Sequence, residues 1–522
     1  MAAMAAVGTM AATALVAAPA AAGNKHSPEG FVERVTTEAV VEHLEAFQAI
    51  ADEHDGNRAA LTEGYEASAQ YVEQTLADAG YTTTRDYFVF DLPVVDAASL
   101  TVGETVLALD QMEFSPSTAV GGLTAPLSAP ADTFGCTAEA WGSVAAAGTI
   151  ALISRGGCPF AQKATTAEAL GAVGVVVYNN TDGMLFGTLG AEGLVTIPTA
   201  GTTQAEGTAL AALLAQGPLT ATLDLREHTE ERESFNVLAE TRRGRDDNVV
   251  MLGAHLDSVE DGPGINDNGT GSAALLEVAV QLARGHKHTN TVRFAWWGAE
   301  ELGLIGSTEY VTELAGQEGE LDRLATYLNF DMVGSPNYII GVYDADESTY
   351  EAPVTVPEGS AATEDVFTGY FDSIGQPWVD TEFSGRSDYQ AFILNGIPAS
   401  GLFTGADDVK TAEEVALFGG TEGITHDPNY HSPEDDIANV STEALGIMVD
   451  AIAYGTYVLA QDTSAINGVS GPGPRPGHGH GGGHGGGHGG GHGGGHGGGH
   501  GGGWGHGGHD HGHPHWGEER AA

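Results

Sequence analysis

The residues between 249 and 301 constrain the fold more than any other part of the chain. Two apolar runs in this stretch end in ionisable side chains, and a Gly-rich turn followed by a helical pattern separates the two runs. This order predicts a strand, a turn, a helix and a second strand. Side chains just beyond the carboxyl ends of parallel strands converge in one crevice, so groups at the two exits should meet. They are His255 at the first exit and Glu300 and Glu301 at the second, with Asp267 in the turn.

Two later stretches add further groups of the same chemical kinds. The buried-strand pattern 324–330 ends in Asp331, and the loop YHSPEDD contains His431. Imidazole and carboxylate ligands together suit zinc, and less often manganese or cobalt. Leaving Glu300 aside, the candidate metal ligands are therefore His255, Asp267, Glu301, Asp331 and His431.

The charges of these candidates favour two metal ions over one. Three carboxylates held close together repel each other and raise one another's pKa unless cations compensate for their charge. Two divalent ions supply that compensation, and a bridging Asp allows five ligands to serve both ions. Two-metal hydrolytic sites lower the pKa of a bridging water, so a hydroxide is the expected nucleophile.

Five motifs carry a family resemblance. GAHLDS, GINDNGTGSAALLE, WWGAEELGLIGS, NFDMVG and YHSPEDD follow one another between residues 253 and 436. Together they resemble the zinc aminopeptidases of family M28, most closely the secreted bacterial type. The resemblance implies an α/β zinc-exopeptidase fold of the phosphorylase/hydrolase-like kind, with a mixed, largely parallel sheet flanked by helices.

The resemblance also implies a role for each site residue. His255 and Asp331 would bind one zinc ion, Glu301 and His431 the other, and Asp267 would bridge them.

The remaining implied roles belong to the protein groups around the ions. They are Glu300 as general base, Tyr430 as a donor to the developing oxyanion, Arg386 in substrate binding, and Asp257 as the carboxylate that orients His255. An Arg386 that pairs structurally with Asp388 is the alternative. The family also has a cis peptide after the bridging Asp, here Asp267–Asn268.

Residues 93–228 differ in composition from the sequence on either side: Ala, Gly and Thr replace the charged helical patterns. The stretch 148–180 predicts a strand, a turn, a helix and a strand. Its segments RGGCPFAQK and GAVGVVVYN resemble a protease-associated (PA) domain inserted into the peptidase. Cys136 and Cys158, the two cysteines of the chain, both lie in this insert. A disulfide is expected in an exported protein, and two buried thiols are the alternative.

The remaining segments complete the predicted organisation. Residues 1–22 are apolar and Ala-rich, which is typical of an export signal, although a simple Ala-rich tail is the alternative. The catalytic domain is expected over 30–92 and 229–465. The His/Gly-rich segment 466–522 has too little apolar surface to fold and is expected to be disordered; its histidines form either a spacer or a zinc-gathering tail.

The charge balance limits the partners. The sequence contains 71 Asp and Glu against 19 Lys and Arg, a net charge of −52, so no basic patch is available to bind nucleic acid. Apart from the signal, no run reaches the ~18 apolar residues that span a bilayer, so no membrane association is expected. The acidic surface either keeps a secreted monomer soluble or adapts it to a salty habitat.

Taken together, the motifs predict a secreted dizinc aminopeptidase. Its substrates are expected to be peptides with a free N-terminus, and the resemblance implies a preference for large apolar residues such as Leu. The alternatives are a carboxypeptidase of the same superfamily and a non-catalytic binding protein on the same scaffold. The cofactor prediction is two zinc ions per chain; no pattern in the sequence predicts calcium binding.

Overall fold

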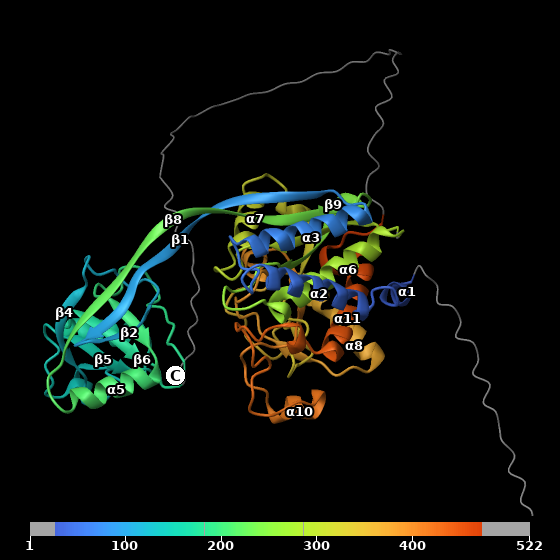
Figure 1. Ribbon diagram of the computed structural model, residues 1–522. Helices are drawn as coiled ribbons and strands as arrows, with labels where there is room; N and C mark the ends of the chain where they lie inside the picture. Colours follow the sequence, from blue (N-terminus) through green and yellow to red (C-terminus); the bar gives the residue numbers. More distant parts are fainter. Residues whose placement is uncertain (1–26, 182, 286, 472–522) are drawn as a thin grey trace, which may run out of the picture. The chain divides into compact units, whose positions relative to one another are not determined.

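The computed structural model describes residues 27–181, 183–285 and 287–471, which form two compact units (Figure 1). The larger unit contains residues 27–88 and 234–471, and the insert unit contains residues 89–233. The chain passes from one unit to the other on two long strands. The predicted domain changeovers at 92/93 and 228/229 lie within these strands, β1 (Thr83–Val102) and β8 (Thr220–Glu240).

The larger unit is built on a mixed sheet with the strand order β13-β12-β14-β11-β9-β10-β8. The central strands β10, β9, β11 and β14 are parallel to their neighbours in this group, while β8 pairs antiparallel with β10 and β12 pairs antiparallel with β14. The predicted largely parallel α/β sheet is therefore confirmed. The strands not yet bounded are β9 (Arg245–His255), β10 (Asn290–Trp297), β11 (Leu324–Phe330), β12 (Gly341–Tyr343), β13 (Val379–Thr381) and β14 (Ala399–Phe403).

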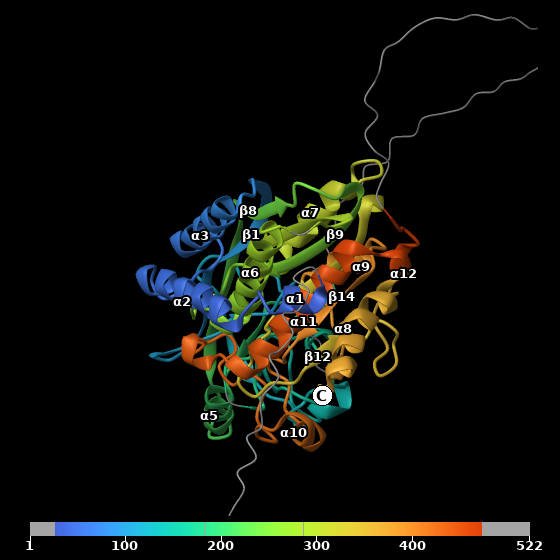
Figure 2. The same ribbon diagram turned by 90° about the vertical axis from the view of Figure 1, so that its right-hand side faces the viewer.

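Helices pack against this sheet, and every residue of β11 is buried. Figure 2 shows α2, α3 and α6 grouped together, with α8 beside α11. The helices are α1 (Pro28–Val32), α2 (Thr37–Glu53), α3 (Glu63–Ala79), α6 (Gly271–Ala283), α7 (Ile305–Ala315), α8 (Ser360–Ile374), α9 (Tyr389–Leu394), α10 (Ala412–Phe418), α11 (Thr442–Gln461) and α12 (Ser464–Asn467). Short helical turns are η2 (Ile265–Thr270), η3 (Leu321–Arg323) and η4 (Ile437–Asn439).

The N-terminal helix pair begins and ends where the sequence supplies capping groups. The hydroxyls of Thr36 and Thr62 accept backbone N–H groups at the starts of α2 and α3. Gly80 ends α3 with a φ of 98°, a conformation that glycine adopts without steric cost. The apolar residues of both segments recur with helical periodicity, which agrees with the two helices.

The C-terminal part of the larger unit extends past its predicted end at residue 465. That position falls inside α12, where Ile466 is buried in the main core and Asn467 donates a hydrogen bond to Asn248. The preceding helix, α11, is long and apolar enough to cross a membrane, but 67% of its 18-residue apolar window is buried in the unit. It therefore serves as a core helix. The predicted export signal and most of the predicted His/Gly tail lie outside the described residues.

The insert unit has its own apolar cores, and its strands continue the sheet from β8 in the order β4-β5-β6-β7-β3. The predicted strand, helix and strand over residues 148–180 are confirmed as β5 (Ile150–Ser154), α4 (Phe160–Ala169) and β6 (Gly174–Tyr178). The other elements are β2 (Thr105–Ala108), β3 (Asp110–Gln111), β4 (Leu123–Ser128), η1 (Ala138–Trp141), β7 (Thr199–Thr202) and α5 (Gln204–Leu214).

The expected disulfide between Cys136 and Cys158 is also confirmed, with an S–S distance of 2.08 Å. The two cysteines are 22 positions apart in the sequence. A disulfide that closes a loop of this length stabilises the folded state by roughly 3 kcal/mol.

Candidate metal centre

The register of the central strands brings the predicted ligands to one edge of the sheet. His255 at the end of β9 lies opposite Trp297 at the end of β10, and Gly253 lies opposite Asn329 in β11. Glu300 and Glu301 lie in the turn after β10, three and four residues beyond its end, and Asp331 directly follows β11. Because these three strands are parallel, their exits share one edge, as the sequence predicts.

Asp267 lies between two groups of side chains and faces each of them with one carboxylate oxygen. Its Oδ1 is 3.2 Å from Nε2 of His255, and its Oδ2 is 3.2 Å from Nε2 of His431. Nε2 of His255 is also 3.4 Å from Oδ1 of Asp331, and Nε2 of His431 is 3.0 Å from Oε2 of Glu301. The five predicted ligands therefore form two adjoining sets that share Asp267.

Each set offers ligand atoms within 4.8 Å of one another, a spacing at which one metal ion can contact all three residues. Two buried carboxylate oxygens, Oε1 of Glu301 and Oδ1 of Asp331, have no hydrogen-bond partner among the described residues. Buried polar atoms are normally satisfied, and metal coordination is one way to satisfy them. The donor set and its orphaned oxygens fit zinc, with His255, Asp267 and Asp331 able to hold one ion and Asp267, Glu301 and His431 another.

Backbone hydrogen bonds fix the segment that carries Asp267. The two carboxylate oxygens of Asp435 accept the backbone N–H groups of Asn266 and Asp267. Asn268 donates from Nδ2 to the carbonyl of Phe330. The Asp267–Asn268 peptide is cis, as the family resemblance implies. Asp267 is thereby tied both to the loop that carries His431 and to the strand that precedes Asp331.

Asp257 lies next to His255, but its backbone carbonyl is closer to the imidazole than its carboxylate is. The Nδ1 atom of His255 lies 3.0 Å from the backbone carbonyl of Asp257, but 3.8 Å from its carboxylate. The carboxylate instead accepts the backbone N–H groups of Glu300 and Glu301, each at 3.3 Å. Asp257 therefore orients the imidazole through its main chain and holds the turn after β10 through its side chain.

Asp331 is held by a chain of buried hydrogen bonds that the sequence analysis did not foresee. Ser387 donates to Oδ2 of Asp331 at 2.5 Å and accepts from Nδ2 of Asn329 at 2.8 Å. Oδ1 of Asn329 accepts from the Tyr327 hydroxyl, which accepts from the Trp297 indole. Such outer partners orient a ligand and increase its basicity.

Three non-glycine residues with positive φ lie at the centre. Ala299 (57°) precedes Glu300, Met332 (51°) follows Asp331, and His431 itself has a φ of 54°. Left-handed backbone is unfavourable for such residues and persists only where surrounding contacts impose it.

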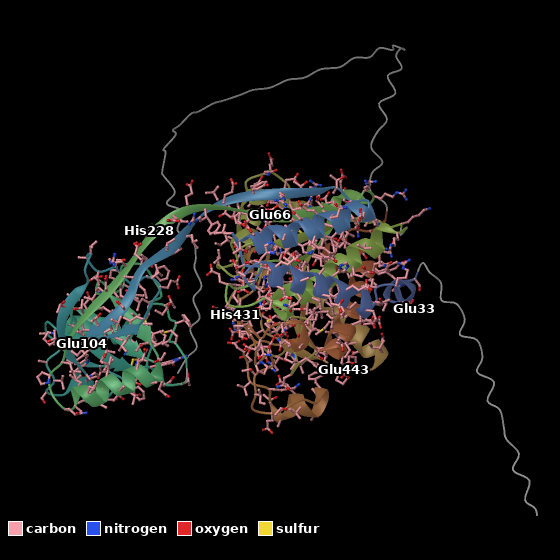
Figure 3. The ribbon with its side chains drawn as sticks, viewed as in Figure 1. Glu33, Glu66, Glu104, His228, His431 and Glu443 are labelled. Atoms are coloured by element: carbon pink, nitrogen blue, oxygen red, sulfur yellow. A yellow bond between two sulfur atoms is a disulfide. The ribbon has the colours of Figure 1, made fainter. Side chains whose placement is uncertain are left out.

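His431, labelled in Figure 3, lies on the larger unit in the turn before Ser432, and its side chain is 38% exposed. The set that contains His431 is therefore more accessible to solvent than the set that contains His255.

The ionisation of the centre reflects burial and crowded charge. Although burial disfavours a charged imidazole, hydrogen bonds to Asp267 and Glu301 raise the pKa of His431 to about 10. Burial raises the pKa of Glu301 to about 7. Burial also raises the pKa of Glu300 well above its ordinary value, while the charge of His255 opposes that increase. Cations are the natural compensation for so many buried carboxylates.

Glu300 is placed differently from its neighbour Glu301. It is 8% exposed, and its Oε2 is 3.8 Å from Nε2 of His255. Whereas Glu301 lies 3.0 Å from His431, Glu300 faces the other set from a longer distance. The two glutamates nevertheless lie close together, because their ligand atoms and that of His255 are all within 4.8 Å of one another. They differ in the imidazole with which each forms its recorded pair: His255 for Glu300 and His431 for Glu301.

Tyr430 and Arg386 adjoin the centre as a pair. The Tyr430 ring stacks on His431 with the ring centroids 3.8 Å apart. Arg386 donates to the Tyr430 hydroxyl at 3.3 Å and forms an ion pair with Asp407 at 3.0 Å. The carboxylate that pairs with Arg386 is therefore that of Asp407 and not that of Asp388, the alternative named above. Asp388 is only 1% exposed, whereas Arg386 lies at the surface.

Two of the residues that support the centre could have been placed near it from the sequence, and a third could not. Ser387 and Asp435 lie in the motifs FSGRSDYQAF and YHSPEDD, so their proximity to the ligands could have been anticipated. Arg58 lies in the N-terminal segment, where no motif pointed to the site, yet it is fully buried beside the loop that follows His255.

Comparisons with known proteins agree with this fold. Residues 236–456 match the family described as Peptidase family M28, and residues 123–210 match the PA domain. The chain is 43% identical over 442 residues to "Probable lipoprotein aminopeptidase LpqL" of Mycobacterium tuberculosis, covering 84% of this chain and 87% of that protein. It is 42% identical over 422 residues to "Leucine aminopeptidase 2" of Trichophyton tonsurans, covering 81% and 83%.

A solved structure is similar as well. BSAP, a zinc aminopeptidase from Bacillus subtilis, superimposes with a TM-score of 0.63 at 28% identity, over 83% of this chain and 98% of that one. The fold and these likenesses define a metallopeptidase of the zinc-dependent aminopeptidase class. The chain belongs to peptidase family M28 and carries an inserted PA domain, so the predicted family is confirmed.

Proposed function

We propose that this chain is a secreted aminopeptidase that uses two zinc ions to remove N-terminal residues, preferentially large apolar ones, from peptides. One observation carries the two-metal part of the proposal. Asp267 presents one oxygen to His255 and Asp331 and the other to His431 and Glu301. A single ion would leave one of these sets without a cation beside its buried carboxylates.

The chain's own groups supply the remaining chemistry. When bound, zinc provides a Lewis acid that lowers the pKa of water and polarises the scissile carbonyl. Glu300 accepts a proton from the attacking water and returns it to the leaving amine, a role that suits a buried carboxyl with a raised pKa. The Tyr430 hydroxyl donates a hydrogen bond to the oxygen on which negative charge develops.

The contacts of Arg386 favour cleavage at the N-terminus over cleavage at the C-terminus. A carboxypeptidase needs cationic groups that can bind the terminal carboxylate of its substrate. Arg386 is already paired with Asp407 and donates to Tyr430, so its guanidinium serves to position the tyrosine. The abundance of carboxylates around the centre suits the ammonium group of a free N-terminus.

Other observations support the finer parts of the proposal. The Trichophyton relative is named a leucine aminopeptidase, in agreement with a preference for large apolar residues. The disulfide Cys136–Cys158 is typical of oxidising compartments outside the cytosol, and the mycobacterial relative is named a lipoprotein. Together with the apolar residues 1–22, these features support export.

A set of matched peptides tests the proposed activity. One sequence with N-terminal Leu is prepared free, N-acetylated and C-amidated, and each form is incubated with enzyme whose zinc content has been measured. We expect the free and amidated peptides to lose Leu and the acetylated peptide to remain intact, with about two zinc ions per chain. Loss of activity on amidation alone would show a carboxypeptidase, and one zinc ion at full activity would refute the two-metal proposal.

A further inference from the structure

Arg58 lies in the segment between α2 and α3 and is 0% exposed. Burying an arginine completely is costly unless its charge and its donors are satisfied. Its guanidinium lies over the Phe47 ring, 5.1 Å from the centroid. Nearby carboxylates include Asp257 and Asp435. Burial lowers the pKa of Arg58 to about 10, so the side chain remains charged at neutral pH.

The donors of Arg58 connect two points that are distant along one loop. Nη1 donates to the carbonyl of Leu256 at 2.5 Å, next to His255. Nε donates to the carbonyl of Pro263 at 2.9 Å, and Nη2 to that of Gly264 at 2.5 Å, three residues before Asp267. The guanidinium therefore joins the start and the end of the 256–264 loop.

The backbone of Arg58 binds the same loop at its middle. Its N–H donates to the Ser258 hydroxyl at 2.9 Å, and its carbonyl accepts the Ser258 N–H at 3.4 Å. The neighbouring Asn57 donates from Nδ2 to the carbonyl of Glu260 at 3.1 Å. An otherwise irregular loop is thus attached along its length to the N-terminal segment.

We propose that Arg58 is a positioning residue for the metal centre, which fixes the spacing between His255 and Asp267 by holding the two ends of the loop that joins them. This inference rests on the proposed function, because it takes both residues as zinc ligands. The side-chain donors of Arg58 go to carbonyls of the loop, so Arg58 acts on the two ligands through the loop. A planar guanidinium can donate to three carbonyls in fixed directions, which the flexible ammonium of lysine cannot reproduce.

A purely electrostatic role predicts the opposite effect on zinc binding. A fixed positive charge close to the centre repels Zn²⁺, so its removal should tighten zinc binding if charge were the only contribution. Loss of a clamp should weaken zinc binding, because the ligands would have to be ordered by the ion itself. The sign of the change therefore separates the two roles.

The experiment compares zinc occupancy in Arg58→Lys, Arg58→Gln and the wild type. Each full-length protein is dialysed against buffered free zinc below its melting temperature, and bound zinc is measured by mass spectrometry. Arg85→Lys and Arg85→Gln are the controls, because Arg85 comes from the same N-terminal part of the chain but pairs with Glu66 and Glu73. These controls report the effect of general destabilisation.

We expect both Arg58 variants to need about 10- to 100-fold more free zinc for half occupancy of the site containing His255, the usual consequence of losing a group that orients ligands. The Arg85 variants should bind zinc as the wild type does. If Arg58→Gln fails to fold, Arg58→Lys and the milder Ser258→Ala, which removes the acceptor of the Arg58 N–H, decide the question.

Two results would overturn the inference. Unchanged zinc binding in Arg58→Lys would show that the three directed hydrogen bonds of the guanidinium are not needed, and tighter zinc binding in Arg58→Gln would show that Arg58 acts on zinc only through its charge. Failure of the wild-type protein to bind zinc at all would instead refute the proposed function on which the inference rests.

Discussion

The larger unit contains two groups of close acidic side chains that differ in what their oxygens contact. The metal centre comprises His255, Asp267, Glu300, Glu301, Asp331 and His431. The second group, here termed the acidic turn, comprises Asp344, Asp346 and Glu364, whose ligand atoms also lie within 4.8 Å of one another. Spacing alone therefore does not distinguish the two groups.

The carboxylate oxygens of the acidic turn accept hydrogen bonds from backbone N–H groups. Asp344 accepts the N–H groups of Ser348, Thr349 and Tyr350 at 2.9, 2.8 and 2.7 Å. One oxygen of Glu364 accepts the N–H groups of Ala345 and Asp346.

In the metal centre, by contrast, the carboxylates face imidazoles and one another, and two buried oxygens lack hydrogen-bond partners among the described residues. Close carboxylates that satisfy backbone donors stabilise a turn, whereas carboxylates with orphaned oxygens and neighbouring imidazoles are arranged for a cation.

The largest expected effect separates two residues within the metal centre. In the proposed mechanism Glu300→Gln removes a base but no ligand, so it should retain about two zinc ions per chain and lose roughly 10²–10⁴-fold in turnover. Glu301→Gln removes an anionic ligand and should bind zinc weakly in the set that contains His431, with partial recovery in excess zinc. Zinc content and turnover are measured side by side for both variants. Loss of a metal from Glu300→Gln, with both retained in Glu301→Gln, would reverse the assigned roles.

The next prediction compares equivalent substitutions in the two groups. Asp331→Asn should weaken zinc binding by about 10- to 100-fold with little loss of stability in the metal-free protein. Asp344→Asn should leave zinc binding unchanged and lower the free energy of unfolding by about 1–3 kcal/mol, because backbone donors lose a charged acceptor. Zinc titration and urea unfolding measure the two effects. The proposed distinction fails if Asp344→Asn changes zinc occupancy or if Asp331→Asn does not.

Much of the centre could be predicted because strand ends carry it. His255, Glu300, Glu301 and Asp331 lie at or just after the ends of buried apolar runs, and parallel strands place such residues at one edge. Asp267 and His431 were predicted as ligands from their residue types in a Gly-rich turn and in the loop YHSPEDD. Local periodicity does not itself place a loop residue such as His431 beside the sheet.

The supporting contacts were harder to foresee. The carbonyl of Asp257, rather than its carboxylate, faces His255, and the partner of Arg386 is Asp407. Arg58 gave no signal at all, because its contacts are with backbone carbonyls some 200 positions away along the chain. Which carbonyl or carboxylate a side chain reaches depends on loop conformation, and periodicity carries no information on that.

The smallest expected effect concerns the pH dependence of the acidic turn. Burial raises the pKa of Glu364 from 4.5 to about 7, against the opposing effect of the backbone N–H groups that it accepts. A carboxyl with a raised pKa holds its proton more tightly in the folded state than in the unfolded state. Its contribution to stability is therefore greatest below pH 4.5 and falls as the pH rises towards 7.

Glu364→Gln should remove this pH dependence, because a neutral amide oxygen can still accept the N–H groups of Ala345 and Asp346. Between pH 5 and pH 8 the free energy of unfolding should fall by about 1 kcal/mol less in the variant than in the wild type. This difference is smaller than the pKa shift alone would give, because solvent screens the charge of Glu364. Chemical unfolding at both pH values measures the difference. Asp365→Asn, at the exposed neighbouring position, is the matched control and should follow the wild type. Parallel curves for Glu364→Gln and the wild type would show that Glu364 is not preferentially protonated in the folded protein.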